Sequence, residues 1–393
     1  MNHDPVVIAA SVRTPIGDFQ GALKRVSATW LGATAIRAAI ERAGVAADAV
    51  SEVIMGNCLS AGLGQAPARQ AALGGGIPAA VGCTTLSKMC GSGMKAVMLG
   101  HDLLLAGSAN MVVAGGMESM TNAPYLIPKA RGGVRLGHAE LKDHMFFDGL
   151  EDAYEPGRLM GSFAEDCAAS YGFTRDQQDD FATESLRRAQ QAIADGTFRR
   201  ETTPVTPREG PQQAIDDDEL PRKASEQKIR GLRPAFRKDG TITAANASAI
   251  SDGAAALVLT RLSTAERLGL TVQARILAHA TYANRPSEFP TAPVPAIRAV
   301  LEKCRWGIGE VDLFEINEAF AVVTLAAMKE LDLPHSKVNV HGGACALGHP
   351  IGATGARIIV TLLAALQRHD LNRGVAALCI GGGEATALAV ERV

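Results

Sequence analysis

The sequence predicts an α/β protein made of two similar halves, with a charged segment inserted into the first half. Two observations predict this fold class. Short β-branched runs alternate with segments of helical periodicity towards both ends of the chain. In addition, the stretch "CGSGMKAVMLGHDLLLAG…MVVAGGMES" is similar to the later "GATGARIIVTLLAAL…VAALCIGGGEA". A repeat of well over 100 residues is too long for a solenoid. It indicates two related halves packed together.

The first elements follow the expected alternation of strand and helix. We expect strands at Pro5–Ala10, Glu52–Met55 and Met111–Ala114, where apolar β-branched residues cluster. Between the first two strands, "SATWLGATAIRAAIERAG" has helical periodicity. Ser27 is placed to cap the start of this helix and Gly44 to end it.

The middle of the chain, from about residue 121 to 247, has a different composition. It contains the acidic run Asp216–Glu219 and many prolines. Thr174 followed by Gln177 forms a capping box, which predicts a helix over "QDDFATESLRRAQQAI". Residues 198–232 are expected to form loop with little core. This composition is typical of an insertion carried on an α/β frame.

The two ends of the chain can be matched residue by residue. "SEVIMGN" parallels "VDLFEIN", each a short strand ending at an asparagine. Generic α/β sequence is the alternative explanation, and four matches in register make it the weaker one. The matched pairs are Gly93 with Gly355, Lys95 with Arg357, Gly115-Gly116 with Gly381-Gly382, and Glu118 with Glu384.

Composition and charge exclude several classes of function. The chain has 393 residues, 47% of them hydrophobic and 20% charged, and a formal net charge of −2. Such a balance gives no electrostatic footprint for nucleic acid or an anionic membrane. The N-terminus lacks a basic region, and no apolar segment is expected to approach the roughly 18–20 residues of a membrane span. We therefore expect a cytoplasmic protein.

The seven cysteines are odd in number and dispersed, without a C-x-x-C pair or a Cys/His cluster at zinc spacing. Neither a disulfide framework nor a metal centre is predicted. His101, His138 and His144 have the sequence context of ordinary structural histidines.

Cys90 is the first candidate catalytic residue. It precedes "GSG" at a strand-to-helix turn. A helix N-terminus lowers the pKa of a thiol, and glycines let the backbone approach a ligand closely. An inert buried cysteine is the competing interpretation, and the local sequence alone does not exclude it.

Three further residues lie in comparable turns of the second half. His349 stands in the glycine-rich "HGGACALGHPIGATGAR" before an apolar helix and could be a general base, or a structural turn residue. Cys379 ends a strand before a triple glycine, whose amides could hold an oxyanion. Asn317 follows another strand and is either a helix cap or an amide that orients water or a carbonyl. No dinucleotide fingerprint is present.

Together, "CGSGMKAV", "NEAFA", "GGACALGHPIGATGAR" and "CIGGG", in this order, resemble the thiolase family of acetyl-CoA acetyltransferases and 3-ketoacyl-CoA thiolases. The similarity extends over nearly the whole chain through "RTPIG", "AGGMESMTNAPY", "MGSFAED" and "LRPAF…NASAISDGAAA". It implies a five-layer α/β/α/β/α core. The implied domains are an N-terminal half at 1–120 and 248–272, an inserted loop domain at 121–247, and a C-terminal half at 273–393.

The resemblance also implies a reaction through an acyl-cysteine. Cys90 would receive the acyl group, and His349 would accept its proton. Cys379 would remove the α-proton of a second acetyl-CoA. One oxyanion hole would be His349 with a water held by Asn317, and the other the N–H groups of Cys90 and Gly381.

By the same resemblance, coenzyme A is a substrate and product, and no metal or redox cofactor is required. The partners implied are acetyl-CoA, acetoacetyl-CoA or another 3-ketoacyl-CoA, and further copies of the chain in a homotetramer, a dimer of dimers. Arg222 would lie near the nucleotide. The full set of implied binding residues is Met160, Arg222, Phe236, Ala244, Ser248, Ala319 and Phe320.

One departure from the family pattern affects the substrate. Biosynthetic members commonly carry a His just before "MG", where this chain has Leu159. We therefore expect an acetyl-CoA C-acetyltransferase first and a broader degradative 3-ketoacyl-CoA thiolase second. A decarboxylating ketoacyl synthase would need a second His where Cys379 stands. A non-catalytic acyl-CoA-binding protein would not need all three reactive side chains.

Overall fold

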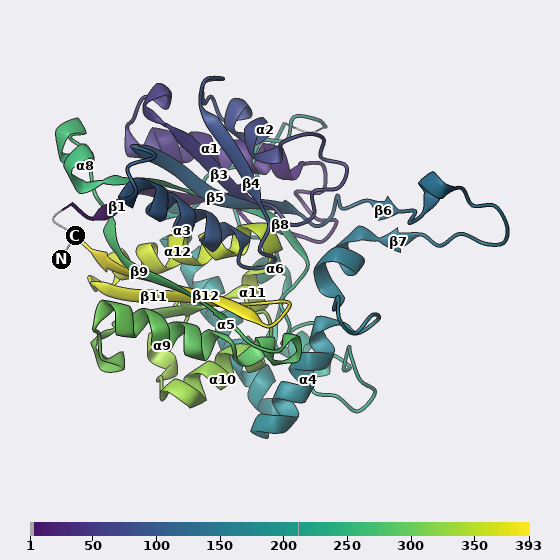
Figure 1. The fold of residues 1–393 in the computed structure, drawn as a ribbon. Helices are drawn as coiled ribbons and strands as arrows, with labels where there is room; N and C mark the ends of the chain where they lie inside the picture. Colours follow the sequence, from purple (N-terminus) through teal and green to yellow (C-terminus); the bar gives the residue numbers. More distant parts are fainter. Residues whose placement is uncertain (1–3, 211) are drawn as a thin grey trace.

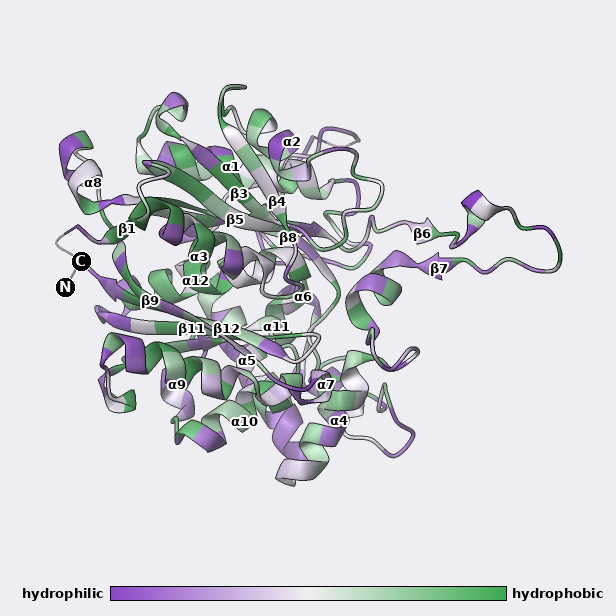
Figure 2. Cartoon of the chain, viewed as in Figure 1, coloured by the Kyte–Doolittle hydropathy of each residue, from purple (hydrophilic) through white to green (hydrophobic). Residues whose placement is uncertain are grey.

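The structure is a computed structural model that describes residues 4–210 and 212–393. The described elements form five layers, in which helices cover the outer faces of two half-sheets and two further helices lie between them (Figure 1). Hydrophobic residues concentrate on the strands and on these central helices (Figure 2). The predicted α/β class is confirmed.

The first half-sheet has the strand order β1-β8-β5-β3-β4, and β2 pairs with β8. β3 runs parallel to β4 and β5, whereas β8 is antiparallel to β5 and β1. Helices α1 (Ala28–Ala43) and α2 (Pro67–Gly74) cover its outer face. The strands are β1 (Val6–Arg13), β2 (Gly17–Asp18), β3 (Glu52–Gly56), β4 (Gly82–Leu86), β5 (Met111–Ser119) and β8 (Ser251–Arg261).

The caps of α1 are those that the sequence predicts. The Ser27 hydroxyl accepts a hydrogen bond from the Trp30 N–H, which satisfies one of the free donors at the helix start. Gly44 ends the helix in the left-handed region, at φ 67°, where glycine is not strained.

The second half-sheet has the order β10-β11-β12-β9, with α9 (Pro293–Cys304) and α10 (Ala321–Leu331) on its outer side. β9 pairs with β1 over two residues, so both half-sheets join along one edge into a ten-stranded sheet in the described part of the chain. α8 (Leu262–Leu268) lies between β8 and β9 in the chain. The strands are β9 (Ala274–Ala283), β10 (Leu313–Ile316), β11 (Arg373–Ile380) and β12 (Glu384–Arg392).

The central layer consists of α3 (Ser92–Leu105) and α12 (Ile351–Arg368), which pack against each other. A Cβ atom on Gly93 would lie 2.7 Å from the backbone nitrogen of Ala356, and one on Gly355 would lie 2.3 Å from that of Met94. Any larger residue would push the helices apart. The predicted match of these glycines therefore has a physical cause, the close helix crossing.

The strand pairing contradicts two of the predicted matches in the repeat, those of Gly115-Gly116 and of Glu118. Gly56 and Ile316 each precede the matched asparagines, and they pair with Gly116 and Ala377 respectively. Gly116 thus corresponds to Ala377, and the match with Gly382 is wrong. By the same register Glu118 corresponds to Cys379, two residues further along in each strand.

α12 has the length and composition of a membrane span, which corrects the expectation that no apolar segment approaches that length. Of its residues, 83% are buried inside the protein. The helix contacts strands of both half-sheets. Because it is buried on all sides, it carries apolar residues on all sides.

Residues between β5 and β8 form an extension on one side of the core (Figure 1). The predicted capping box at Thr174 and Gln177 starts α5. Residues 198–232 have more core than expected, because Phe198 is buried and Asp218 forms a buried ion pair of 2.7 Å with Arg13. The elements are β6 (Tyr125–Leu126), β7 (Lys142–Asp143), α4 (Met160–Tyr171), α5 (Arg175–Ala194), α6 (Leu220–Lys223) and α7 (Glu226–Gly231).

Candidate active site

The predicted reactive residues meet at one cavity of about 470 Å³. Cys90 lies just before α3, His349 just before α12, and Cys379 near the end of β11. All three line the cavity, together with Gly381. The cavity therefore receives one thiol from the first half and an imidazole and a second thiol from the other half.

The turn that carries Cys90 is held in an unusual backbone conformation. Met89 has a φ of 46°, in the left-handed region that non-glycine residues rarely adopt. Gly91 lies in close contact with β11, because a Cβ there would lie 2.4 Å from the Cδ1 atom and 3.0 Å from the Cγ1 atom of Ile380. The Ser92 hydroxyl accepts a hydrogen bond of 2.8 Å from the Lys88 N–H. These constraints fix the thiol beside the end of β11.

The Cys90 thiol is neutral near pH 7. Burial raises its pKa to about 11, against the opposing effect of the N–H groups of Gly381 and of Cys90 itself. The expectation that the helix start lowers the pKa is therefore wrong, since desolvation of the thiolate is the larger effect. A nucleophile in this state needs a base.

His349 has the protonation and the tautomer of such a base. Burial, and secondarily the charge of Arg357, lowers its pKa to about 3, so the ring is neutral. Its Nδ1 lies 2.7 Å from the Thr354 hydroxyl oxygen, which itself donates to the carbonyl of Pro350 at 3.0 Å. Because that hydroxyl proton is already used, Nδ1 carries the ring proton. Nε2 keeps its lone pair and has no partner among the described residues.

Cys379 is buried, and burial raises its pKa well above the usual thiol value. A negative charge on Cys90 raises it further, whereas the Cys379 N–H opposes the shift. Ionisation of one thiol thus disfavours ionisation of the other. The pair favours at most one negative charge at a time.

Asn317 follows β10 and does not belong to the residues that line the cavity. Its N–H donates to the carbonyl of Ala377, but both polar atoms of its side chain are buried without a partner among the described residues. Buried amides of this kind normally bind a water or a ligand. The predicted water at Asn317 stays a prediction.

Glu118 is a site-supporting residue that the sequence analysis matched with Glu384 but did not connect with the site. Its carboxylate accepts hydrogen bonds from the N–H groups of Cys58, Leu59 and Gly352, the last at 2.9 Å. Burial raises its pKa to about 7. The bond to Gly352 attaches the beginning of α12, and with it the His349 turn, to the end of β5.

The remaining wall of the cavity is largely apolar. Gly161 allows the Phe236 ring to pack on the start of α4, because a Cβ there would lie 2.3 Å from that ring. Six of the seven predicted binding residues line the cavity, as does Leu159: Met160, Phe236, Ala244, Ser248, Ala319 and Phe320. The sequence analysis did not predict the other large apolar side chains there: Phe19, Phe146, Leu150, Leu220, Ile250, Phe289 and Ile351.

Arg222 is the binding residue that the structure does not bring to the cavity. It lies on α6, is exposed, and forms an ion pair with Asp217. Its neighbour Leu220 lines the cavity instead. The predicted place of Arg222 near a nucleotide stays a prediction.

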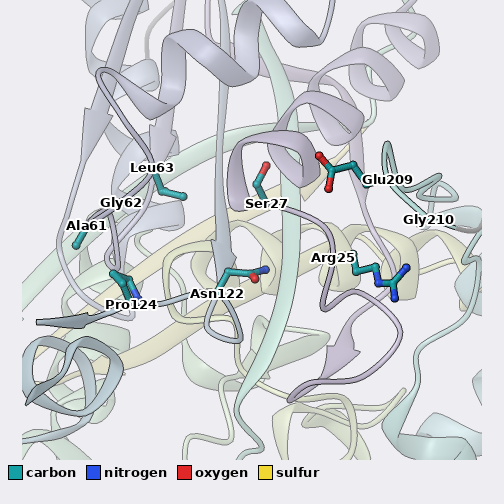
Figure 3. A pocket seen from close by; sticks show the side chains of 9 residues that line it. All are labelled: Arg25, Ser27, Ala61, Gly62, Leu63, Asn122, Pro124, Glu209 and Gly210. Carbon is teal, nitrogen blue, oxygen red and sulfur yellow. The ribbon is translucent and has the colours of Figure 1, made fainter. Parts of the chain in front are cut away.

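A larger hollow of about 660 Å³ lies elsewhere on the surface (Figure 3). Arg25, Glu209 and Asn122 line it, together with Ser27 at the start of α1. Neither a cysteine nor a histidine is among its described lining residues. Size alone therefore does not identify the reactive site.

Comparison with known proteins agrees with this fold and site. Residues 6–263 match the family described as "Thiolase, N-terminal domain" and residues 270–392 match "Thiolase, C-terminal domain". An acetyl-CoA acetyltransferase of Cupriavidus necator is 49% identical over 98% of this chain and 99% of its own. One of Pseudomonas aeruginosa is 48% identical over the same shares.

Two solved structures are also similar. The acetyl-CoA acetyltransferase of Bacillus anthracis superposes with a TM-score of 0.96, at 43% identity and 99% coverage of both chains. An Ascaris suum thiolase in complex with coenzyme A gives a TM-score of 0.94, at 43% identity, over 99% of this chain and 100% of its own.

A fold of two α/β halves, with two thiols and a neutral imidazole at one cavity, defines an enzyme of the acyltransferase class. More particularly, the chain belongs to the thiolase family. The family and the thiolase-like fold predicted from the sequence are confirmed.

Proposed function

We propose that the protein is an acetyl-CoA C-acetyltransferase, which joins two acetyl-CoA molecules reversibly to give acetoacetyl-CoA and CoA. The observation that carries this proposal is the meeting of Cys90, His349 and Cys379 at one cavity with a largely apolar wall. The names of the similar proteins support the choice of substrate. Coenzyme A acts as substrate and product, and the reaction requires no metal or redox cofactor.

In the first half-reaction, His349 Nε2 accepts the Cys90 proton while the sulfur attacks the carbonyl carbon of acetyl-CoA. The carbon–sulfur bond to CoA breaks, and the departing CoA sulfur takes the proton from His349. The N–H groups of Cys90 and Gly381 are placed beside the nucleophilic sulfur, where they can stabilise the oxyanion. Each such donor typically contributes about 10²–10³ in rate.

In the second half-reaction, neutral His349 accepts the proton of Cys379 at Nε2, and the resulting Cys379 thiolate removes an α-proton from a second acetyl-CoA. The resulting carbanion attacks the acetyl carbon on Cys90 and displaces the Cys90 sulfur as thiolate. His349 then gives its proton to the Cys90 thiolate while Cys379 keeps the α-proton, which restores the starting state of two neutral thiols and a neutral imidazole. The mutual disfavouring of charge on the two thiols suits this scheme, since only one thiolate exists at each stage.

Thr354 acts as a positioning residue, because its hydroxyl fixes the tautomer of His349. Thr354→Val keeps the volume but leaves the buried Nδ1–H unpaired, at a cost of about 1–3 kcal/mol. We expect kcat to fall about 10- to 100-fold with KM nearly unchanged. Steady-state kinetics test this, with Thr354→Ser as the control that restores the hydroxyl. A Thr354→Ser variant as impaired as Thr354→Val would contradict the role.

The second candidate function is a broader 3-ketoacyl-CoA thiolase, favoured by Leu159, Phe146 and Leu150 in the cavity wall. Thiolysis of 3-ketoacyl-CoA substrates of increasing chain length separates the two. We expect kcat/KM to fall at least about tenfold when the acetoacetyl group is lengthened by two methylenes, within the range by which pockets discriminate such groups. Equal or rising values would support the broader function.

We further propose that the chain forms a homotetramer, a dimer of dimers, acts in the cytoplasm, and has the three-domain division set out above. The arm between β6 and β7 supports the assembly, because Tyr125, Leu136 and Leu141 on it are exposed and apolar (Figure 1). Sedimentation equilibrium measures the assembly mass directly.

A further inference from the structure

A histidine–aspartate–histidine cluster lies outside the active site. His101 and Asp102 are neighbours on α3, and His279 lies on β9 of the other half. His101 Nδ1 lies 3.1 Å from the Asp102 carboxylate oxygen, and His279 Nε2 lies 2.9 Å from the same oxygen. The mechanism proposed above uses none of these residues.

The geometry of the three donor atoms fits a metal ion. All lie within 4.8 Å of one another. In a tetrahedral zinc site with bonds of about 2.0 Å, two ligand atoms are about 3.3 Å apart, close to both hydrogen-bond distances of the cluster. The two imidazole rings stand at 89° with centroids 5.0 Å apart, so each ring edge can face a shared ion.

The environment of the three side chains is compatible with metal binding. Lys303 donates a hydrogen bond of 2.8 Å to the carbonyl oxygen of His279 and so holds the backbone of β9 at this residue. The two histidines are largely enclosed, whereas the Asp102 side chain is 52% exposed, which gives water access to a fourth position.

We propose that His101 Nδ1, His279 Nε2 and the Asp102 carboxylate bind a divalent transition metal of the zinc class, with water as the fourth ligand. The metal ties α3 to β9 and so connects the two halves of the protein. His101 lies nine residues beyond Ser92, about 14 Å along the helix from its start. The metal therefore stabilises the fold and takes no part in the reaction at Cys90.

Zinc binding to the full-length protein tests the proposal. Metal-depleted wild type, His279→Asn and Asp102→Asn are dialysed against graded Zn²⁺, and the bound metal is measured by elemental analysis. We expect wild type to bind one Zn²⁺ equivalent more than His279→Asn, and Asp102→Asn to bind at least tenfold more weakly. His369→Asn is the matched control, because it removes an exposed histidine of another pair and leaves this cluster intact.

Two further readouts separate this site from the active-site thiols. Zn²⁺ should raise the melting temperature of wild type but not of His279→Asn, while both retain thiolysis activity. Co²⁺ bound at the site should give visible absorption without a thiolate charge-transfer band. Equal zinc stoichiometry in wild type and His279→Asn, or a cobalt spectrum of wild type that shows only a thiolate band and equals that of His279→Asn, would overturn the proposal.

Discussion

The Cys90→Ala variant is expected to lose thiolysis of acetoacetyl-CoA by about 10⁴-fold or more, because it removes the atom that carries the acyl group. Acetyl transfer from acetyl-CoA to the protein should also disappear. The fold should persist, since Cys90 is only half-buried and alanine fits the turn without a clash. Spectrophotometric thiolysis and intact mass after mixing with acetyl-CoA measure the two losses.

Cys83→Ala is the control for this substitution. Cys83 is also half-buried, but it lies on β4 and does not line the cavity. Its variant should keep full activity and acylation. A Cys90→Ala protein that still becomes acetylated would show that another residue is the nucleophile.

Cys379→Ala is expected to separate the two half-reactions. His349 and Cys90 remain, so the enzyme should still be acetylated by acetyl-CoA. Condensation should fall by about 10³-fold or more, within the range of a lost general base, because no thiolate remains to remove the α-proton. Acetoacetyl-CoA formation and acetyl-enzyme formation are measured on the same preparation.

Cys167→Ala provides a matched control for Cys379. Both thiols are buried in the same apolar cluster, and burial raises the pKa of each, to about 12 for Cys167. Only Cys379 lines the cavity. Equal losses of condensation in the two variants would assign the effect to packing and refute the base role.

The fold could be predicted from the sequence where local chemistry decides the structure. Ser27, Gly44 and Thr174 mark helix ends through hydrogen bonds or φ values that involve only neighbouring residues. Gly93 and Gly355 could be matched because a close helix crossing excludes any side chain. The matches of Gly115-Gly116 and Glu118 were wrong, since strand register is set by pairing partners far along the chain.

Only part of the site could be predicted from the sequence. Motifs identified Cys90, His349 and Cys379, but the pKa of Cys90 depends on burial, which the turn sequence does not encode. Thr354 and Glu118 were missed, because their roles are hydrogen bonds formed in the folded chain.

Two further features could not be predicted from the sequence. Asp102 and His279 are 177 positions apart, so no spacing rule could join them. Arg222 was assigned by resemblance alone, and its exposed side chain pairs with Asp217 outside the cavity.

Peptide mapping of the wild-type enzyme after brief mixing with acetyl-CoA tests the central claim most directly. The claim is that the acyl group passes through the first-half thiol at the shared cavity. We predict one acetyl group per chain, on the peptide that contains Cys90, and its removal when CoA is added. An acetyl group on Cys379 or on a residue outside the cavity, or an acetyl group that CoA does not remove, would contradict this account.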